Sequence, residues 1–210
     1  MRLSVTIGFD DTFVVRTLAS LGPVEELYLL YAVTGAPEDS KSEATARDVV
    51  KVVRKGTPVA IDLRDLATAF SQVAGVNFDT VALAGGPRAL VVITLTAAMV
   101  KDCRIYLVPE YQGEVIDATS LLAVKKLYRL PKGKLEVLTA IEGRMKYGEV
   151  AEKVGLHPTT VHRYLEKLEE VGLVRRAGKR SGEFETDKLT KALAKAFLNS
   201  RKQGPDEPQA

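Results

Sequence analysis

The sequence has few of the residues that disulfides and metal centres require. Its 210 residues include one cysteine, Cys103, and two histidines, His157 and His162. A single cysteine cannot form an internal disulfide, and these residues leave no spacing typical of a zinc site. Cys103 begins an apolar run, so we expect it to be a small buried hydrophobic residue. The sequence therefore predicts no metal and no cofactor.

Long apolar runs are also lacking. Residues 89–100 are interrupted by threonines and are followed by Lys101 and Asp102, whereas a membrane helix needs roughly 18 consecutive apolar residues. The apolar run before Asp10 and Asp11 is too short for a signal peptide. We therefore expect a cytoplasmic protein without a membrane partner.

What remains is the composition of a globular protein with unevenly distributed charge. Hydrophobic residues make up 46% of the chain and charged residues 27%, which is enough to build a buried core. Residues 1–118 carry 11 basic and 15 acidic side chains, whereas residues 131–203 carry 16 basic and 10 acidic side chains. A polyanion would therefore bind to the carboxyl-terminal part of the chain.

The first 118 residues alternate short apolar runs with helical patterns. Strands are predicted at 3–7, 26–33, 59–63, 80–84, 104–108 and 114–116. Helices are predicted over 12–21, 40–55, 65–74 and from the glycines after residue 84 to about residue 101. Asp10 or Asp11 would cap the first helix, and the second would turn Ala44, Val49, Val52 and Val53 inward. This alternation predicts a Rossmann-like parallel α/β sheet covered on both faces.

A second pattern begins after Pro131. Apolar residues at helical spacing predict helices around 135–141, 150–154 and 161–168, followed by a hairpin over 173–186 and a last helix over 188–200. The predicted organisation is an α/β domain over 1–118, an amphipathic linker over 119–130, a winged helix-turn-helix domain over 131–200 and a disordered tail over 201–210.

The stretch YGEVAEKVGLHPTTVHRYLEKLEEVGLVRR, residues 147–176, is typical of a helix-turn-helix. Pro158 suits a first helical position. If Val161, Leu165 and Leu168 face inward, the outward side chains are hydroxyls and an arginine, which are types that read base edges. The predicted DNA-binding residues are Tyr147, Pro158, Thr159, Thr160, His162, Arg163, Lys167, Arg175, Arg176, Lys179 and Arg180. The alternative is a three-helix module for protein contact or dimerisation.

Two glycines, Gly85 and Gly86, separate the fourth predicted strand from the helix after it. In a parallel α/β sheet, ligands bind beyond the carboxyl ends of the strands, where this loop would meet the loops 8–12, 33–39 and 108–113. Glycines allow close backbone approach, the helix directs free N–H groups there, and Arg88 adds positive charge. No Walker or GxGxxG motif occurs. The loop could equally be a simple turn.

The stretches TIGFDDTFVVR (6–16) and ALAGGPRALVV (82–92), followed by the winged helix GLHPTTVHRYLEKLEEVGLVRR, resemble archaeal regulators with a CRISPR-associated Rossmann fold, or CARF, domain. The resemblance implies a two-fold homodimer that binds a cyclic oligoadenylate, typically cyclic tetra-adenylate, across its axis. The implied contacts are Gly8, Phe9, Asp10, Thr12, Gly85, Gly86, Pro87 and Arg88, with Thr34 from the less similar 33–39 loop.

The same resemblance raises the question of catalysis. Ribonuclease members of the group carry an Arg-x4–6-His motif, which neither histidine here completes. Cleavage of the cyclic ligand has only Arg88 and Thr12 as candidates, and neither is a tuned general base. We therefore expect no catalytic residues, and a dimeric transcription regulator that binds promoter DNA in or near a CRISPR locus. The alternatives are a metal-independent ring nuclease with an accessory winged helix, and a constitutive DNA-binding protein whose α/β half only dimerises.

Overall fold

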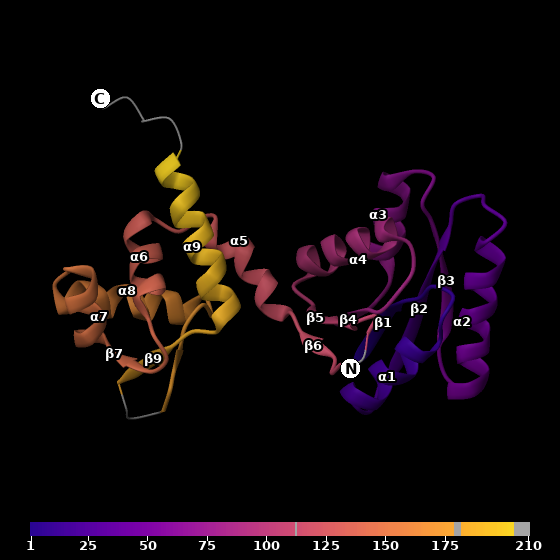
Figure 1. Ribbon diagram of the computed structural model, residues 1–210, viewed down its shortest axis with the longest axis horizontal. Helices are drawn as coiled ribbons and strands as arrows, with labels where there is room; N and C mark the ends of the chain where they lie inside the picture. Colours follow the sequence, from indigo (N-terminus) through magenta and orange to yellow (C-terminus); the bar gives the residue numbers. More distant parts are fainter. Residues whose placement is uncertain (112, 179–181, 204–210) are drawn as a thin grey trace. The chain divides into compact units, whose positions relative to one another are not determined.

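The computed structural model describes residues 1–111, 113–178 and 182–203 of the chain. The chain divides into two compact units, Met1–Thr119 and Ser120–Ala210 (Figure 1). Within the described residues, no helix has the length and apolar character that crossing a membrane requires.

The first unit is a six-stranded sheet with helices on both faces. Its strands are β1 (Arg2–Thr6), β2 (Glu26–Val33), β3 (Thr57–Asp62), β4 (Thr80–Leu83), β5 (Arg104–Leu107) and β6 (Ile116–Asp117). Its helices are α1 (Thr12–Leu21), α2 (Asp39–Val53), α3 (Leu66–Gly75) and α4 (Arg88–Lys101). The strand order is β3-β2-β1-β4-β5-β6, and every neighbouring pair is parallel except β5 and β6. The predicted Rossmann-like α/β fold is confirmed.

The two faces of the sheet have separate cores. Leu3, Val5 and Ile7 pack in one apolar cluster with residues of α1 and α2. Because side chains alternate along a strand, Ser4 and Thr6 of β1 turn to the opposite face. Figure 1 shows α3 and α4 next to each other, and the two helices are in contact. The central strand β1 is therefore buried from both sides, and its polar residues Ser4 and Thr6 are as fully buried as Leu3 and Val5.

The inner face of α2 differs from the prediction. Ala46 and Val49 are buried, whereas Val52 is 70% exposed, and Ala44 is exposed as well. The buried positions follow helical steps of four and three residues from Ser42, so the next inward position is 53 rather than 52.

The second unit combines helices with a small antiparallel sheet. After the short 3-10 helix η1 (Thr119–Leu122) come α5 (Ala123–Leu127), α6 (Lys132–Ala140), α7 (Tyr147–Val154), α8 (Pro158–Glu170) and α9 (Lys188–Gln203). The sheet has the order β7 (Met145–Lys146), β9 (Glu183–Glu185) and β8 (Arg175–Arg176). The predicted helices and hairpin are present, and β7 is additional because two residues give no alternation signal.

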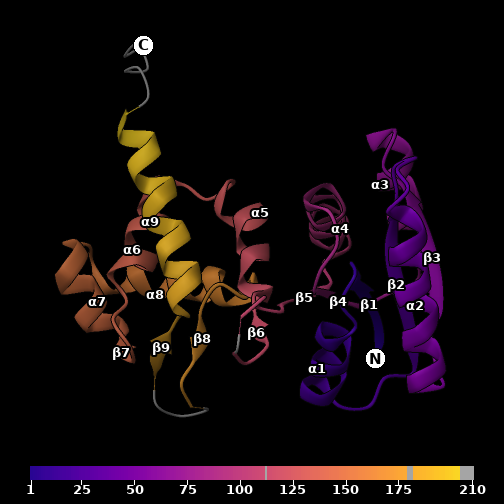
Figure 2. The ribbon, with the colours of Figure 1, turned by 45° about the vertical axis from the view of Figure 1, so that its right-hand side comes forward.

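The segment 119–130, which the sequence predicts to be a linker, belongs to the core of the second unit. Ala123 and Leu127 of α5 are buried in the same cluster as Leu135 and Leu138. Figure 2 shows α9 running beside α5 and α6, and both contacts are present. The amphipathic pattern of 119–130 therefore reflects packing. The last helix continues to Gln203, and residues 204–210 of the predicted tail lie outside the described residues.

Candidate functional sites

The order of the strands reverses between β1 and β4. The chain runs from β1 outward through β2 and β3, and then returns to place β4 on the other side of β1. Open α/β sheets bind ligands beyond the carboxyl ends of the strands at such a point. The loops 7–11 and 84–87 leave the sheet there, so the two stretches singled out in the sequence meet at one place.

The two loops touch through their glycines. A Cβ atom at Gly8 would lie 2.8 Å from the amide nitrogen of Gly86, and one at Gly86 would lie 2.8 Å from the carbonyl oxygen of Ile7. Gly86 also has a φ of +92°, which a residue with a side chain rarely adopts. The buried Thr6 hydroxyl accepts the N–H groups of Ala84 and Gly85, at 3.0 and 3.3 Å. From the sequence, these glycines are expected to let the backbone approach a ligand. In the structure, Gly8 and Gly86 let the loops 7–11 and 84–87 approach each other.

A hollow lies on each side of this glycine contact. The first hollow has a volume of about 340 Å³ and is lined by Gly8, Phe9, Ala32, Thr34, Ala36, Glu38, Asp39, Ser42, Gly86 and Pro87. The second hollow has a volume of about 350 Å³ and is lined by Gly8, Phe9, Asp10, Phe13, Ala84, Gly85, Gly86 and Glu110. Phe9 lines both hollows and is 65% exposed. Thr12 and Arg88 are the predicted ligand contacts that line neither.

Arg88 and Asp10 differ in what they contact. Arg88 is the exposed first residue of α4, and no hydrogen bond or ion pair joins its guanidinium to the described residues. The carboxylate of Asp10 accepts the backbone N–H of Thr12 at 2.8 Å, and hydrogen bonding by Thr12, chiefly from its side chain, lowers the pKa of Asp10. Asp11 occupies the cap position without a side-chain bond. Asp10 is therefore the carboxylate that binds the start of α1.

The 33–39 loop is organised by Asp39, which the sequence reading did not select. Its carboxylate accepts the backbone N–H groups of Thr34 and Gly35, each at 2.7 Å, and the hydroxyl of Thr34 at 2.9 Å. The bond from the Thr34 backbone is the main cause of the lowered pKa of Asp39. Since Thr34 donates its hydroxyl proton to Asp39, it could meet a ligand only as an acceptor.

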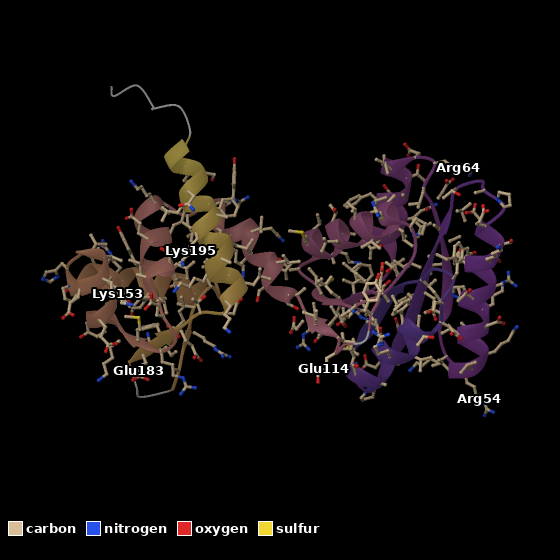
Figure 3. The ribbon with its side chains drawn as sticks, in the orientation of Figure 1. Arg54, Arg64, Glu114, Lys153, Glu183 and Lys195 are labelled. Atoms are coloured by element: carbon tan, nitrogen blue, oxygen red, sulfur yellow. The ribbon has the colours of Figure 1, made fainter. Side chains whose placement is uncertain are left out.

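Arg64 is a second residue that the sequence reading missed at this edge. Its side chain passes within 4.0 Å of the Cβ position of Gly35. Its Nε and Nη2 donate to the two carboxylate oxygens of Asp62, at 2.8 and 2.6 Å, which lowers the pKa of Asp62 to about 2. Figure 3 shows Arg64 at one end of this unit and Arg54, which follows α2, at the other. The position of Arg64 in the sequence could have indicated it, because it closely follows the carboxyl end of the predicted third strand, where ligands bind in such sheets.

In the second unit, α8 presents the predicted recognition surface. Pro158 is its first residue, and Nδ1 of His157 accepts the N–H of Thr159 at 3.4 Å. Val161, Leu165 and Leu168 are fully buried, as predicted. Of the outward residues, Thr159 and Arg163 are exposed, and Thr160 and His162 are half-buried. No hydrogen bond or ion pair joins the Arg163 side chain to the described residues.

The other basic residues of the predicted surface that the structure describes are each paired with a glutamate. Lys167 lies 2.9 Å from Glu170, Arg175 lies 2.9 Å from Glu185, and Arg176 lies 2.8 Å from Glu169. Arg144, which the sequence reading did not select, shares Glu185 at 3.3 Å. Lys179 and Arg180 lie outside the described residues. Among the described residues of the predicted surface, the unpaired part is thus the amino-terminal half of α8.

Tyr147 lies beside this half of α8. Its ring meets the ring of His162 edge-on, with centroids 5.2 Å apart, and Nδ1 of His162 lies 3.6 Å from Glu166. Among the described residues, no group of three or more His, Cys, Asp or Glu side chains is arranged to hold a metal ion.

The fold and these sites define a two-unit protein, in which a Rossmann-like unit with a loop site precedes a winged helix-turn-helix unit. Residues 1–119 match the family of the Csa3 CRISPR-associated Rossmann-like domain, and residues 135–178 match the IclR helix-turn-helix domain. A relative from Thermoproteus tenax, a CRISPR locus-related protein Csa3 whose name gives DNA binding as a predicted property, is 40% identical over 199 residues. These residues cover 95% of this chain and 98% of the relative. The chain belongs to the Csa3 family.

Two solved structures are more distant. One is Can2 from Sulfobacillus thermosulfidooxidans in complex with cyclic tetra-adenylate, with 11% identity, a TM-score of 0.42 and coverage of 95% of this chain and 63% of Can2. The other is protein VC1899 from Vibrio cholerae, with 11% identity, a TM-score of 0.38 and coverage of 96% and 67%. At this level of similarity, neither structure supports an argument about fold or ligand.

Proposed function

We propose that the chain is a DNA-binding transcription regulator controlled by a cyclic oligoadenylate. Its second unit would bind promoter DNA in or near a CRISPR locus, and its first unit would bind cyclic tetra-adenylate. Membership of the Csa3 family and the name of the Thermoproteus tenax relative support DNA binding. The ligand rests on the CARF resemblance of residues 6–16 and 82–92 and on the loops at which those residues meet.

The observation that carries DNA binding is the unpaired Arg163 on the amino-terminal half of α8. Helix-turn-helix proteins direct the amino-terminal residues of the recognition helix at base edges. Arg163 can make a bidentate contact with guanine, and the Thr159 hydroxyl can bond to several bases. Val161, Leu165 and Leu168 of the same helix are completely buried. This packing fixes the helix in the unit and therefore the direction in which its outer residues point.

The site at the strand-order reversal supports binding of a cyclic nucleotide. Arg88 and the free N–H groups at the start of α4 suit phosphate groups, and the exposed Phe9 ring suits stacking on a base. The hollows beside the Gly8 and Gly86 contact have volumes of 340 and 350 Å³, near the lower end of the range for small-molecule sites.

The exposed face of α4 supports homodimerisation through the first unit. Val92 and Val100 are 60% and 63% exposed, and they lie two helical turns apart on one side of the helix. Thr96 lies between them and donates its hydroxyl to the carbonyl of Val92 at 2.8 Å, so its methyl group extends the apolar stripe. Since Arg88 begins the same helix, two copies joined along this stripe with the two-fold axis parallel to the helices would bring two such arginines to one symmetric site.

Calorimetric titration tests the proposal. We expect cyclic tetra-adenylate to bind wild type at one ring per two chains, and binding to weaken at least tenfold in Arg88→Ala. Arg54→Asn is the control, because it removes a charge at the other end of the unit (Figure 3) and asparagine tolerates the left-handed conformation of that position. If wild type gives no heat of binding, the proposal that the first unit binds cyclic tetra-adenylate is contradicted.

DNA binding is measured with and without the ring at a fixed salt concentration. A change in affinity on adding ligand supports control by the ring, and an unchanged affinity supports the constitutive alternative. The ligand is also recovered after incubation with the protein and analysed for cleavage. An intact ring argues against the ring-nuclease alternative, and a linear product would support it.

A further inference from the structure

The hollows at the proposed ligand site carry an electrostatic feature that phosphate binding does not explain. Each is lined by carboxylates, Glu38 and Asp39 in the first and Asp10 and Glu110 in the second. Carboxylates at ordinary pH are acceptors and repel phosphate. A carboxylate that contacts the ligand would therefore meet a part of it that donates hydrogen bonds.

Two of the four carboxylates are already used within the protein. Asp39 accepts three hydrogen bonds from Thr34 and Gly35, and Asp10 accepts the N–H at the start of α1. Glu38 and Glu110 are exposed, and no hydrogen bond or ion pair joins their side chains to the described residues. Each hollow thus has one carboxylate that is available to a ligand.

The backbone that carries each available carboxylate is fixed by its neighbours. Glu38 directly precedes α2, next to Asp39, which binds the loop before it. Glu110 follows Pro109, whose carbonyl accepts Nη1 of Arg16 at 2.8 Å. Arg16 in turn lies over the ring of Phe13, 5.3 Å from its centroid. With the backbone fixed, only the glutamate side chain itself has to be ordered on binding.

We propose that Glu38 and Glu110 read the adenine bases of the ring, each accepting a hydrogen bond from one exocyclic 6-amino group while Phe9 stacks between the hollows. The inference rests on the proposed function and specifies it further. Adenine presents an amino donor at the position where guanine and hypoxanthine present a carbonyl oxygen, which a carboxylate would repel. Two hollows in each chain match two of the four bases of a tetra-adenylate ring shared by two copies.

The test compares cyclic tetra-adenylate with cyclic tetra-inosinate, in which a carbonyl oxygen replaces each 6-amino group. We expect wild type to prefer the adenylate ring by about tenfold or more, since one matched base contact contributes roughly five- to 140-fold and each chain would make two. In Glu38→Gln and Glu110→Gln the preference should fall, and in the double variant the two rings should bind about equally. The glutamine amide can accept from adenine or donate to hypoxanthine.

Glu25→Gln is the matched control. Glu25 pairs with the amino terminus, at 3.0 Å, before β2, which is the opposite edge of the sheet from the hollows. It should keep the wild-type preference. The inference is overturned if both site variants also keep that preference, or if they lose affinity for the two rings equally, which would assign the carboxylates to ribose hydroxyls. If wild type binds neither ring, the proposed function itself fails.

Discussion

The guanidinium of Arg176 in β8 is held against the carboxylate of Glu169 in α8, with its Nε 2.8 Å from Oε2. The same guanidinium lies over the ring of Phe184, 5.2 Å from the centroid. Its Nη2 also lies 4.0 Å from Oε1 of Glu166. Arg176 therefore joins the wing to the recognition helix and is not free to approach DNA in this conformation.

This pairing gives different roles to two arginines that are both predicted from the sequence to bind DNA, Arg163 at base edges and Arg176 at phosphates. We expect Arg176→Ala to lower the thermal unfolding midpoint while its preference for specific over random DNA stays close to wild type. Arg163→Ala should leave the midpoint unchanged and reduce discrimination between specific and random DNA by about 1–3 kcal/mol, because it removes one base contact. Thermal unfolding and fluorescence anisotropy on both DNAs measure these effects. If the two variants exchanged these phenotypes, our assignment of both arginines would be wrong.

The close approach of the two glycine loops predicts a steric effect at Gly8. Gly8→Ala would place a Cβ atom 2.8 Å from the amide nitrogen of Gly86, and forced packing of this kind costs about 1–3 kcal/mol. Gly75→Ala is the control, since that position at the end of α3 has no heavy atom within 4 Å of the added Cβ. Urea unfolding should show a clear loss of stability for Gly8→Ala only. Equal effects would mean that the loops move apart easily.

The bond between Asp62 and Arg64 predicts a pH dependence in the acid range. Arg64 lowers the pKa of Asp62 from 3.8 to about 2, so the folded state favours the ionised carboxylate. Its contribution to stability is therefore complete above about pH 4 and is lost as the pH falls through about 2. Asp62→Asn should unfold at a lower temperature than wild type at pH 6, and this difference should shrink toward pH 2. A difference that stays constant over this range would exclude the ion pair as its cause.

The exposed valines of α4 predict an effect on self-association. Val92→Asp places a charge in the middle of the apolar stripe, so we expect it to convert a dimer to monomers in sedimentation experiments. Val52→Asp is the matched control, because Val52 is 70% exposed on α2, outside the proposed interface. A dimer that survives the Val92 change would show that another surface joins the two copies.

The sequence predicts most of the architecture because the buried residues recur at regular spacing. Val161, Leu165 and Leu168 give the correct inner face of α8, and the apolar strands give the Rossmann-like sheet. The two-residue strand β7 and the packing of α5 are missed, since neither has a pattern long enough to separate it from a loop or linker. The errors at Ala44 and Val52 have a different origin, because alanines and valines occupy both the inner and the outer face of α2.

The candidate sites are less predictable, because they depend on which side chains meet. The sequence locates Gly8, Gly86 and Arg88, but it cannot show that the glycines fit against each other. For an anionic ligand, the residues expected from the sequence are basic ones such as Arg88. Glu38 and Glu110 are therefore not predicted. The glutamates that pair with Arg175 and Arg176 come from other elements, and only the folded chain shows these two pairs.

The distribution of charge along α8 limits how much of a duplex one copy can read. Its carboxyl-terminal half carries Glu166, Glu169 and Glu170, which phosphates on either side of a groove would repel. The helix would therefore lie in the groove with residues 158–164 only. Seven residues at about 1.5 Å each span the rise of roughly three base pairs. A target this short recurs throughout any genome, so accurate choice of a promoter would depend on two copies and on the distance between their half-sites.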